Sequence, residues 1–370
     1  MGINTEQENI SKIITFLRFP LIVMVVFIHA HFGNVIVNGK NILENNSGKI
    51  YDYLSCYISD IICAIAVPMF FLISGYLFFN NRHLNFNSLN RGGYGYKLKR
   101  RVKTLFVPYI IWNALVILLF YLAQTFFPEM LSGSNKLIKD FSLYDYIWAF
   151  WDTSKIQHGM QPYPICFQFW FLRDLMVMSL LAYIVHFIVT KIPYLLLIPG
   201  VLWFVGYQGI MPGLSYSAIF FFSCGAYISL RINLKQVKRV RFIFTNLVTY
   251  FLVSIIALIL YSTDFFSAAR ALSIMSGIIL LVQISPYIIK RLNWDNIISL
   301  SHSSFFIYAY HGIPLTIIIR LIIKFLNPST NISLIFIYVV SPILVIVCGY
   351  YIYKFTHRFL PRFTNLITGR

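Results

Sequence analysis

The sequence predicts an all-α membrane protein, a polytopic bundle of about ten transmembrane helices. Hydrophobic residues make up 58% of the 370 residues and charged residues only 11%, a balance unlike that of a soluble domain. The apolar residues fall into repeated runs of roughly 20, and a helix of that length covers the roughly 30 Å hydrocarbon layer of a bilayer. Because these runs do not alternate with polar residues, they favour helices over a transmembrane barrel.

The helices follow from these runs in chain order. The first run follows a polar, acidic start without the cleavage site of a signal peptide, so this helix is expected to stay in the mature chain. The second run contains Pro68, the third directly follows the basic stretch KLKRRVK, and the fourth follows a polar excursion at 128–165. The ninth carries Gly312 and Pro314. The ten predicted segments are 13–32, 56–79, 105–127, 167–190, 192–208, 215–231, 242–262, 267–289, 297–322 and 332–353.

Lysine and arginine gather on one side once the loops are assigned alternately to the two membrane faces. Residues 80–104 hold seven Lys/Arg, 231–241 hold five and 354–370 hold four, all without acids. The opposite loops, chiefly 33–54 and 128–165, carry five Lys/Arg and six Asp/Glu. Since basic loops stay in the cytoplasm, both termini are predicted to be cytoplasmic. The net charge of +18 is then mostly a topology signal.

Several other classes of protein and site are not favoured. No basic helix or aromatic RNA-reading motif accompanies the positive charge, so nucleic acid is not an expected partner. The five cysteines include no CxxC pair, so neither a disulfide framework nor a thiolate metal site is expected. We expect one integral-membrane domain over residues 1–370, with the excursion at 128–165 on its outer side. No feature of the sequence specifies an oligomeric state.

The first helix carries two ionisable residues inside the apolar stretch RFPLIVMVVFIHAHF. Arg18 and His29 are eleven residues apart, which on a helix returns to within about 20° of the same face at an axial separation of about 16 Å. Intramembrane charges are costly and usually face a bundle interior or a wet cavity, so we expect this pair to line a passage. The alternative is that Arg18 snorkels to the headgroups and His29 caps the outer interface. His31 points elsewhere, and a metal site is not expected.

Five motifs in order resemble the membrane acyltransferase-3 family over nearly the whole chain. They are Arg18 with His29 after ten intervening residues, VPMFFLISGYLFF at 67–79, KLKRRVKTLFVPYIIW at 97–112, FWFLRDLMV at 169–177 and SSFFIYAYHG at 303–312. The resemblance implies a bacterial membrane O-acyltransferase that modifies surface polysaccharides or small molecules. It also implies a multi-pass protein of the bacterial inner membrane, here without the fused periplasmic esterase-like domain of some members.

Two positions depart from that family's pattern. Thr104 stands where many members have a second arginine in the basic segment, although Arg100 and Lys103 are close by. Gln168 stands where many members have a histidine two residues before the tryptophan of the WFL segment.

Transfer of an acyl group from a thioester to a sugar hydroxyl needs a base, stabilisation of the tetrahedral intermediate and a grip on an anionic donor. We assign the base to His29, since neutral histidine accepts a proton near pH 7. Arg18 is expected to bind a donor phosphate or to steady the thioester. Arg100, Arg101 and Lys103 are expected to hold the phosphates of coenzyme A, with contact to lipid headgroups as the alternative.

Ser74 and Gly75 lie beyond Pro68 in the second helix. Proline removes a backbone donor and bends a helix, and glycine permits close approach of a ligand or of another backbone. We therefore expect these two residues either to contact acyl-CoA or to pack helix against helix.

Trp170, Arg173 and Asp174 lie near the outer end of the fourth helix and are candidate acceptor-site residues. Adjacent helical residues diverge by about 100°, so Arg173 and Asp174 are expected to pair with other helices and not with each other. A buried structural ion pair is the alternative.

His311 is a further candidate for the acceptor site or for support of the base. Tyr308 lies three residues earlier on the same face, which predicts a hydrogen-bonded Tyr and His pair. Gly312 and Pro314 are expected to loosen the ninth helix beside them. A histidine with a purely structural role is the alternative.

The expected function is transfer of an acyl group, most simply acetyl, from cytoplasmic acyl-CoA to a hydroxyl of a surface polysaccharide or lipid-linked glycan. The pantetheine arm would bring the thioester toward His29, and no permanently bound cofactor is expected. O-succinyl transfer and a covalent acyl-enzyme stay open. A glycan transporter or flippase is the main alternative, although the paired inverted halves typical of transporters are not evident in the sequence.

Overall fold

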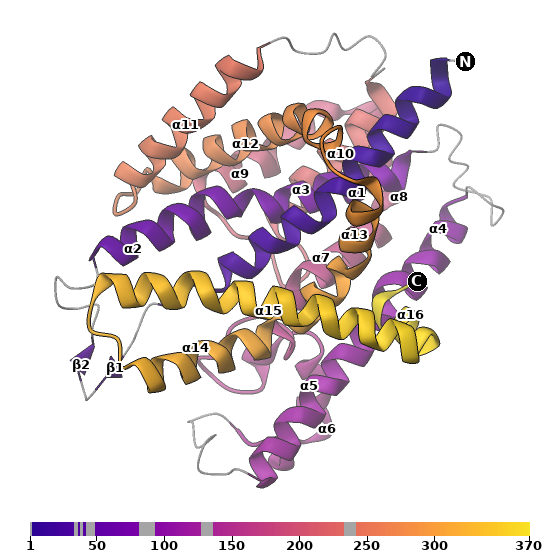
Figure 1. Ribbon diagram of the computed structural model, residues 1–370. Coiled ribbons are helices and arrows are strands. Elements are labelled where there is room, and N and C mark those ends of the chain that lie inside the picture. Colours follow the sequence, from indigo (N-terminus) through magenta and orange to yellow (C-terminus); the bar gives the residue numbers. More distant parts are fainter. Residues whose placement is uncertain are drawn as a thin grey trace. The chain divides into compact units, whose positions relative to one another are not determined.

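The structure is a computed structural model that describes residues 2–32, 36–37, 40–41, 49–80, 93–126, 136–232 and 242–370. Figure 1 shows that helices dominate the described chain. The described strands are the two-residue β1 (Ile36–Val37) and β2 (Lys40–Asn41), which pair antiparallel with Ile36 opposite Asn41. The predicted all-α class is therefore confirmed.

The chain divides into two compact units, each assembled from three separate segments. Unit 1 comprises Met1–Ile73, Gly200–Tyr207 and Arg231–Phe355, and unit 2 comprises Ser74–Pro199, Gln208–Leu230 and Thr356–Arg370. The boundary between Ile73 and Ser74 falls inside one helix, α3 (Ala66–Phe79). The single domain expected from the sequence stays a prediction.

Unit 1 is built around α1, whose inner face repeats at helical spacing. Ile14, Leu17, Leu21 and Val25 are buried along one stripe of this helix. In the same unit α1 packs against α12 and α13, and α11 and α12 lie side by side (Figure 1). Its elements are α1 (Gly2–Ile28), α2 (Lys49–Ser55), η2 (Cys56–Ile62), η3 (Cys63–Ile65), the start of α3, most of α9 (Leu197–Val205), α11 (Ile243–Ile259), α12 (Phe266–Ile289), α13 (Trp294–Tyr310), α14 (Gly312–Leu326) and most of α15 (Asn331–Phe359).

Unit 2 has an aromatic core. Phe79 and Phe222 are fully buried and meet edge to face with ring centroids 6.2 Å apart. Phe169 is also fully buried and stacks on Tyr109 at 5.7 Å. The unit contains the end of α3, α4 (Tyr94–Arg101), η4 (Val102–Phe106), α5 (Val107–Phe126), η6 (Ile138–Asp140), α6 (Leu143–Ala149), η7 (Thr153–Lys155), η8 (Phe167–Phe169), α7 (Trp170–Leu180), α8 (Ala182–Lys191), η9 (Pro193–Leu196), α10 (Tyr216–Arg231) and α16 (Pro361–Thr368).

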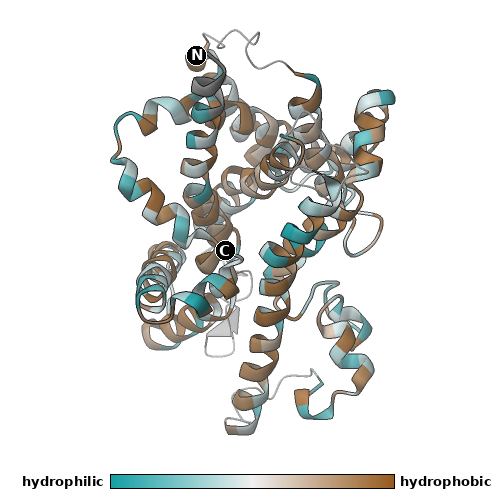
Figure 2. Ribbon diagram, turned by 90° about the vertical axis from the view of Figure 1, so that its right-hand side faces the viewer, coloured by the Kyte–Doolittle hydropathy of each residue, from teal (hydrophilic) through white to brown (hydrophobic). Residues whose placement is uncertain are grey.

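Length and composition make several of these helices able to cross a membrane. Five qualify in the described chain, at Glu8–Ile28, Lys49–Phe79, Tyr94–Phe126, Phe266–Ile289 and Asn331–Phe359. The number rises to as many as seven if each of two bent helix pairs counts as one span. These pairs are Phe167–Leu180 with Ala182–Lys191 and Trp294–Tyr310 with Gly312–Leu326. Figure 2 shows that apolar residues predominate along many of the helices. The protein is thus a multi-pass membrane protein, while the orientation of its termini stays a prediction.

The sizes of the bends in these helices were not predicted, although Gly312 and Pro314 were expected to loosen the ninth helix. The predicted fourth helix bends by 64° after Leu180, and the predicted ninth bends by 71° after Tyr310. The second predicted helix includes a π-helical stretch, η2, before the turn of 3₁₀ helix at η3. The first helix ends at Ile28, so His29 lies in the turn that follows it and not within the helix. The end of α1, the stretch η2 and the bend after Tyr310 lie in unit 1, as do the polar residues of the candidate site; π-helical and broken segments are common near functional residues.

Candidate active site

The most distinctive feature of unit 1 is a pair of stacked histidines. The rings of His29 and His311 lie with their centroids 5.4 Å apart and their planes 27° from parallel. His311 is completely buried and His29 is half-buried. The sequence named both residues but did not place them together, because no local periodicity links positions that are so far apart in the chain.

The hydrogen bonds of His311 define which of its nitrogens can accept a proton. Its Nδ1 lies 2.7 Å from the carbonyl oxygen of Tyr308. A carbonyl only accepts hydrogen bonds, so Nδ1 donates, and a neutral ring then carries its lone pair on Nε2. Nε2 is buried and has no hydrogen-bond partner in the part of the chain that the structure describes. Since an unpaired buried polar atom is costly, this nitrogen is available to a ligand or a proton.

The local sequence explains why His311 occupies this position. It is the residue at which α13 ends and α14 begins, where its backbone N–H still bonds to the carbonyl of Ile307. Pro314 has no backbone N–H, and Gly312 starts the new helix, so the continuous α-helical ladder is interrupted here. The predicted loosening of the ninth helix is confirmed, and it goes as far as a 71° bend.

The predicted hydrogen bond between Tyr308 and His311 is confirmed, and it uses the backbone of Tyr308. His311 Nδ1 bonds to the backbone carbonyl of Tyr308, and the centroids of the two rings lie 6.2 Å apart. A residue three positions earlier in a helix presents its carbonyl to a side chain as readily as it presents its own side chain.

Arg18 lies on α1, ten residues before the end of that helix. Its side chain is exposed within the described structure, whereas His29 is half-buried. Pro20 lies inside α1 between the two residues and removes one hydrogen bond of the helical ladder. The expectation that Arg18 and His29 line a common passage stays a prediction.

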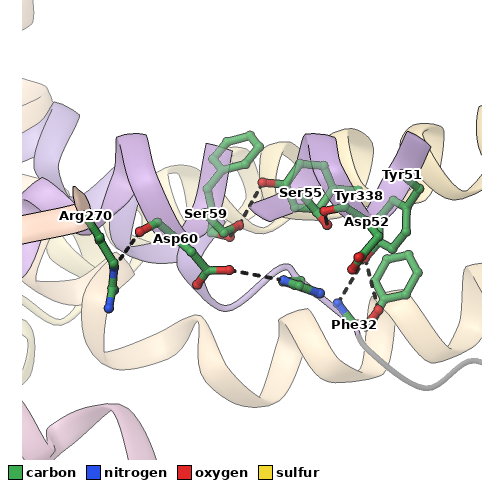
Figure 3. A network of polar contacts seen from close by, with 10 residues as sticks. Phe32, Tyr51, Asp52, Ser55, Ser59, Asp60, Arg270 and Tyr338 are labelled. Atoms are coloured by element: carbon green, nitrogen blue, oxygen red, sulfur yellow. Dashed lines mark hydrogen bonds and ion pairs between the residues drawn. The ribbon is translucent and has the colours of Figure 1, made fainter. Parts of the chain in front are cut away.

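Unit 1, which contains the histidine pair, also contains a row of polar contacts (Figure 3). Tyr51 exchanges hydrogen bonds with the backbone of Phe32 at 3.1 Å, and Ser59 donates to the carbonyl of Phe27 at 2.6 Å. These bonds tie the turn after α1 to α2 and η2. Further along η2, the backbone carbonyl of Asp60 accepts a hydrogen bond from Nε of Arg270 at 2.6 Å.

Sequence reasoning missed Asp60 and Arg270. Both are charged residues within apolar runs, at 56–79 and 267–289 respectively. An ionisable residue in a membrane-spanning segment is by default a functional candidate, so this rule would have found them.

The basic segment lies in unit 2. Two of its positive side chains lie over the ring of Phe78, and others are exposed. Lys97 and Arg101, four residues apart on α4, are placed over the Phe78 ring at 5.4 and 5.8 Å, and Lys97 also donates to the Phe78 carbonyl. Arg100 and Lys103 are exposed. The predicted set of Arg100, Arg101 and Lys103 therefore does not present one common face, and Lys97 joins Arg101.

Gly75 is a point of close helix packing. A Cβ atom added there would lie 2.0 Å from the carbonyl oxygen of Phe222, so α3 and α10 approach each other closely at this residue. The neighbouring Ser74 is half-buried. Of the two roles expected for this pair, the geometry of Gly75 matches helix packing.

Arg173 and Asp174 contact each other, contrary to the sequence-based expectation. Arg173 Nη2 lies 3.4 Å from Asp174 Oδ1, and both side chains are buried. Arg173 Nη1 also donates to the carbonyls of Trp151 and Pro162, and the backbone N–H of Ser215 donates to Asp174. The flexible arginine side chain bridges the angular gap between adjacent residues. The bonds of Arg173 connect α7 to the polar excursion, and the bond to Asp174 connects α7 to the residue before α10, as a structural pair would. Trp170 is the first residue of α7 and is half-buried.

Together these features define a multi-pass helical membrane protein with a stacked pair of histidines. The family described as an acyltransferase domain, acyltransferase-3, matches residues 12–353. The chain therefore belongs to this acyltransferase family, as its motifs predicted.

One curated relative is the succinoglycan biosynthesis protein ExoH of Rhizobium meliloti (strain 1021). It is 24% identical over 245 residues, which cover 63% of this chain and 58% of the relative. No solved structure matches the chain significantly.

Proposed function

We propose that this protein transfers an acyl group from cytoplasmic acyl-CoA to a hydroxyl of a cell-surface polysaccharide or lipid-linked glycan. Membership of the acyltransferase family supports acyl transfer. Similarity to a succinoglycan biosynthesis protein supports a glycan as the acceptor. Acetyl is the simplest acyl group, and succinyl is the alternative.

The stacked pair of His29 and His311 carries the proposal. The acceptor hydroxyl gives its proton to His29 while its oxygen attacks the carbonyl carbon of the thioester. The tetrahedral intermediate then collapses, the carbon–sulfur bond breaks, and the imidazolium returns the proton to the sulfur. The products are the glycan ester and free coenzyme A. His311, held by its bond to the Tyr308 carbonyl, supports the ring of His29 from one side.

The donor phosphates are assigned to the basic segment of unit 2. Arg101 makes no hydrogen bond with the described residues, and its contact with Phe78 holds it in place. A guanidinium with free donors binds phosphate oxygens through charge-assisted hydrogen bonds. Lys97 lies over the same ring and adds a second charge.

The proposal includes a location and an orientation. The protein is assigned to the bacterial inner membrane with both termini in the cytoplasm, because the basic loops lie on the side of the termini in the alternating assignment. Acyl-CoA is a cytoplasmic donor, so the basic segment at 97–103 would then face the compartment that supplies it.

The test uses the purified protein in proteoliposomes with radiolabelled acetyl-CoA or succinyl-CoA. We expect release of free coenzyme A to rise when a lipid-linked glycan fraction is added, with label appearing in the glycan as an alkali-labile ester. Movement of glycan across the bilayer without any consumption of acyl-CoA would identify a flippase instead.

A further inference from the structure

His31, Asp60 and Arg270 converge from three elements of unit 1. His31 follows the turn after α1, Asp60 lies in η2, and Arg270 lies near the start of α12. His31 Nδ1 is 3.7 Å from the Asp60 carboxylate, and Arg270 Nε bonds to the Asp60 backbone carbonyl. Figure 3 shows Asp60 and Arg270 side by side, with the Asp60 carboxylate turned away from the bond to Arg270.

These side chains keep most of their hydrogen-bonding capacity. Within the described residues the Asp60 carboxylate accepts no hydrogen bond, His31 makes none, and Arg270 uses only its Nε. The side chains of His31 and Asp60 are 21% and 35% exposed, so a ligand can reach them. Polar side chains on apolar helices whose donors and acceptors are largely unused point to a ligand that forms hydrogen bonds with them.

The mixture of charges selects the kind of ligand. A phosphate or carboxylate ligand would be repelled by the Asp60 carboxylate, and a cationic ligand would be repelled by the Arg270 guanidinium. A sugar hydroxyl is neutral and both donates and accepts, so neighbouring hydroxyls can donate to Asp60 and accept from Arg270. His31 is two residues from His29, which limits the separation of their Cα atoms to about 7 Å.

We propose that His31, Asp60 and Arg270 form a subsite that binds hydroxyls of the sugar acceptor next to His29. This deepens the proposed function and rests on it for the identity of the ligand. The subsite is held in place before binding, because Tyr51 bonds to the backbone of Phe32 and Ser59 to that of Phe27, on either side of the turn that carries the histidines.

The test measures glycan binding directly, without turnover. A fluorescent glycan released from the lipid-linked fraction is titrated into the full-length protein in nanodiscs without acyl-CoA. Replacing Arg270→Gln or Asp60→Asn is expected to raise the Kd for the glycan by about tenfold or more, since each removes a charge-assisted hydrogen bond. Arg270→Lys keeps the charge and should retain part of the affinity. Arg320→Gln, the same change at an exposed arginine of α14, should leave the Kd unchanged.

The same variants are then assayed for transfer. The KM for the glycan should rise while the KM for acyl-CoA and the slow hydrolysis of acyl-CoA by water stay within twofold. A folded Arg270→Gln or Asp60→Asn protein that binds the glycan with wild-type affinity overturns the subsite, even if transfer is observed. Glycan binding that depends on these residues, without transfer by the wild type, contradicts the proposed function and leaves the subsite standing.

Discussion

His29 and His311 stack with their ring centroids 5.4 Å apart, although 282 positions separate them in the sequence. The contact depends on the bend between α13 and α14, which places His311 at a helix junction facing the turn after α1. The hydrogen bond from His311 Nδ1 to the Tyr308 carbonyl fixes the orientation of the His311 ring, and the His29 ring stacks on it. This arrangement suits proton transfer to and from a reacting oxygen.

Replacing Arg101→Ala should weaken donor binding more than acceptor binding. The guanidinium is held over Phe78 with its donors free, and loss of a charge-assisted bond to phosphate raises the KM for acyl-CoA by roughly tenfold or more. Steady-state transfer at varied acyl-CoA concentration measures this. The control is Arg362→Ala, at an exposed arginine of α16 in the same unit. An equal change in both variants would mean that Arg101 only contacts lipid headgroups.

Replacing Gly75→Ala should destabilise unit 2. The new Cβ would lie 2.0 Å from the Phe222 carbonyl oxygen, so α3 and α10 must move apart. Overpacking of this kind costs about 1–3 kcal/mol or more. We expect a lower midpoint of thermal unfolding in detergent, whereas Ser74→Ala on the same helix should change it little. A Gly75→Ala protein as stable as the wild type would show that the two helices do not approach so closely.

Asp145 should make the polar excursion sensitive to acid. Hydrogen bonds from Lys136 and Ser142 lower the pKa of the Asp145 carboxyl to about 2, below the value of about 3.9 expected in an unfolded chain. A lowered folded-state pKa contributes stability that is complete above the unfolded value and is lost as the pH falls toward the folded value. Hydrogen exchange of residues 136–155, corrected for intrinsic rates, should therefore accelerate between about pH 4 and pH 2.

The Asp145→Asn variant provides the control for this acid effect. The asparagine side chain cannot ionise. The backbone amides of residues 136–155 should therefore exchange faster in this variant than in the wild type at pH 5, and their exchange rates should depend less on pH below 4. Identical pH profiles for the two proteins would exclude Asp145 as the source.

The sequence was sufficient for the all-α class and for several helices, because apolar runs are local signals. Ten membrane spans were predicted, whereas five helices of the described chain, or up to seven segments with the bent pairs, are long and apolar enough to cross a membrane. The apolar runs at 267–289 and 332–353 match α12 and α15 to within a few residues at most ends. The bend at His311 was only partly foreseen, since Gly312 and Pro314 weaken a helix without specifying an angle.

The contacts between distant segments could not be predicted. The convergence of His31, Asp60 and Arg270 depends on which helices pack together, and a single sequence carries no periodicity for that. The contact between Arg173 and Asp174 was missed for a different reason. The expectation used helix geometry alone, whereas a long arginine side chain reaches a neighbour that its own Cα direction does not face.

The central claim, that His29 is the base for acyl transfer, is tested most directly by the rate of transfer in membranes that contain equal amounts of wild-type, His29→Ala and Arg18→Ala protein. Removal of a general base lowers the rate by about 100-fold or more, so His29→Ala should retain almost no label transfer to the glycan. Arg18→Ala should also lose most of its activity. Near-normal transfer by His29→Ala at equal abundance would contradict the assignment of the base.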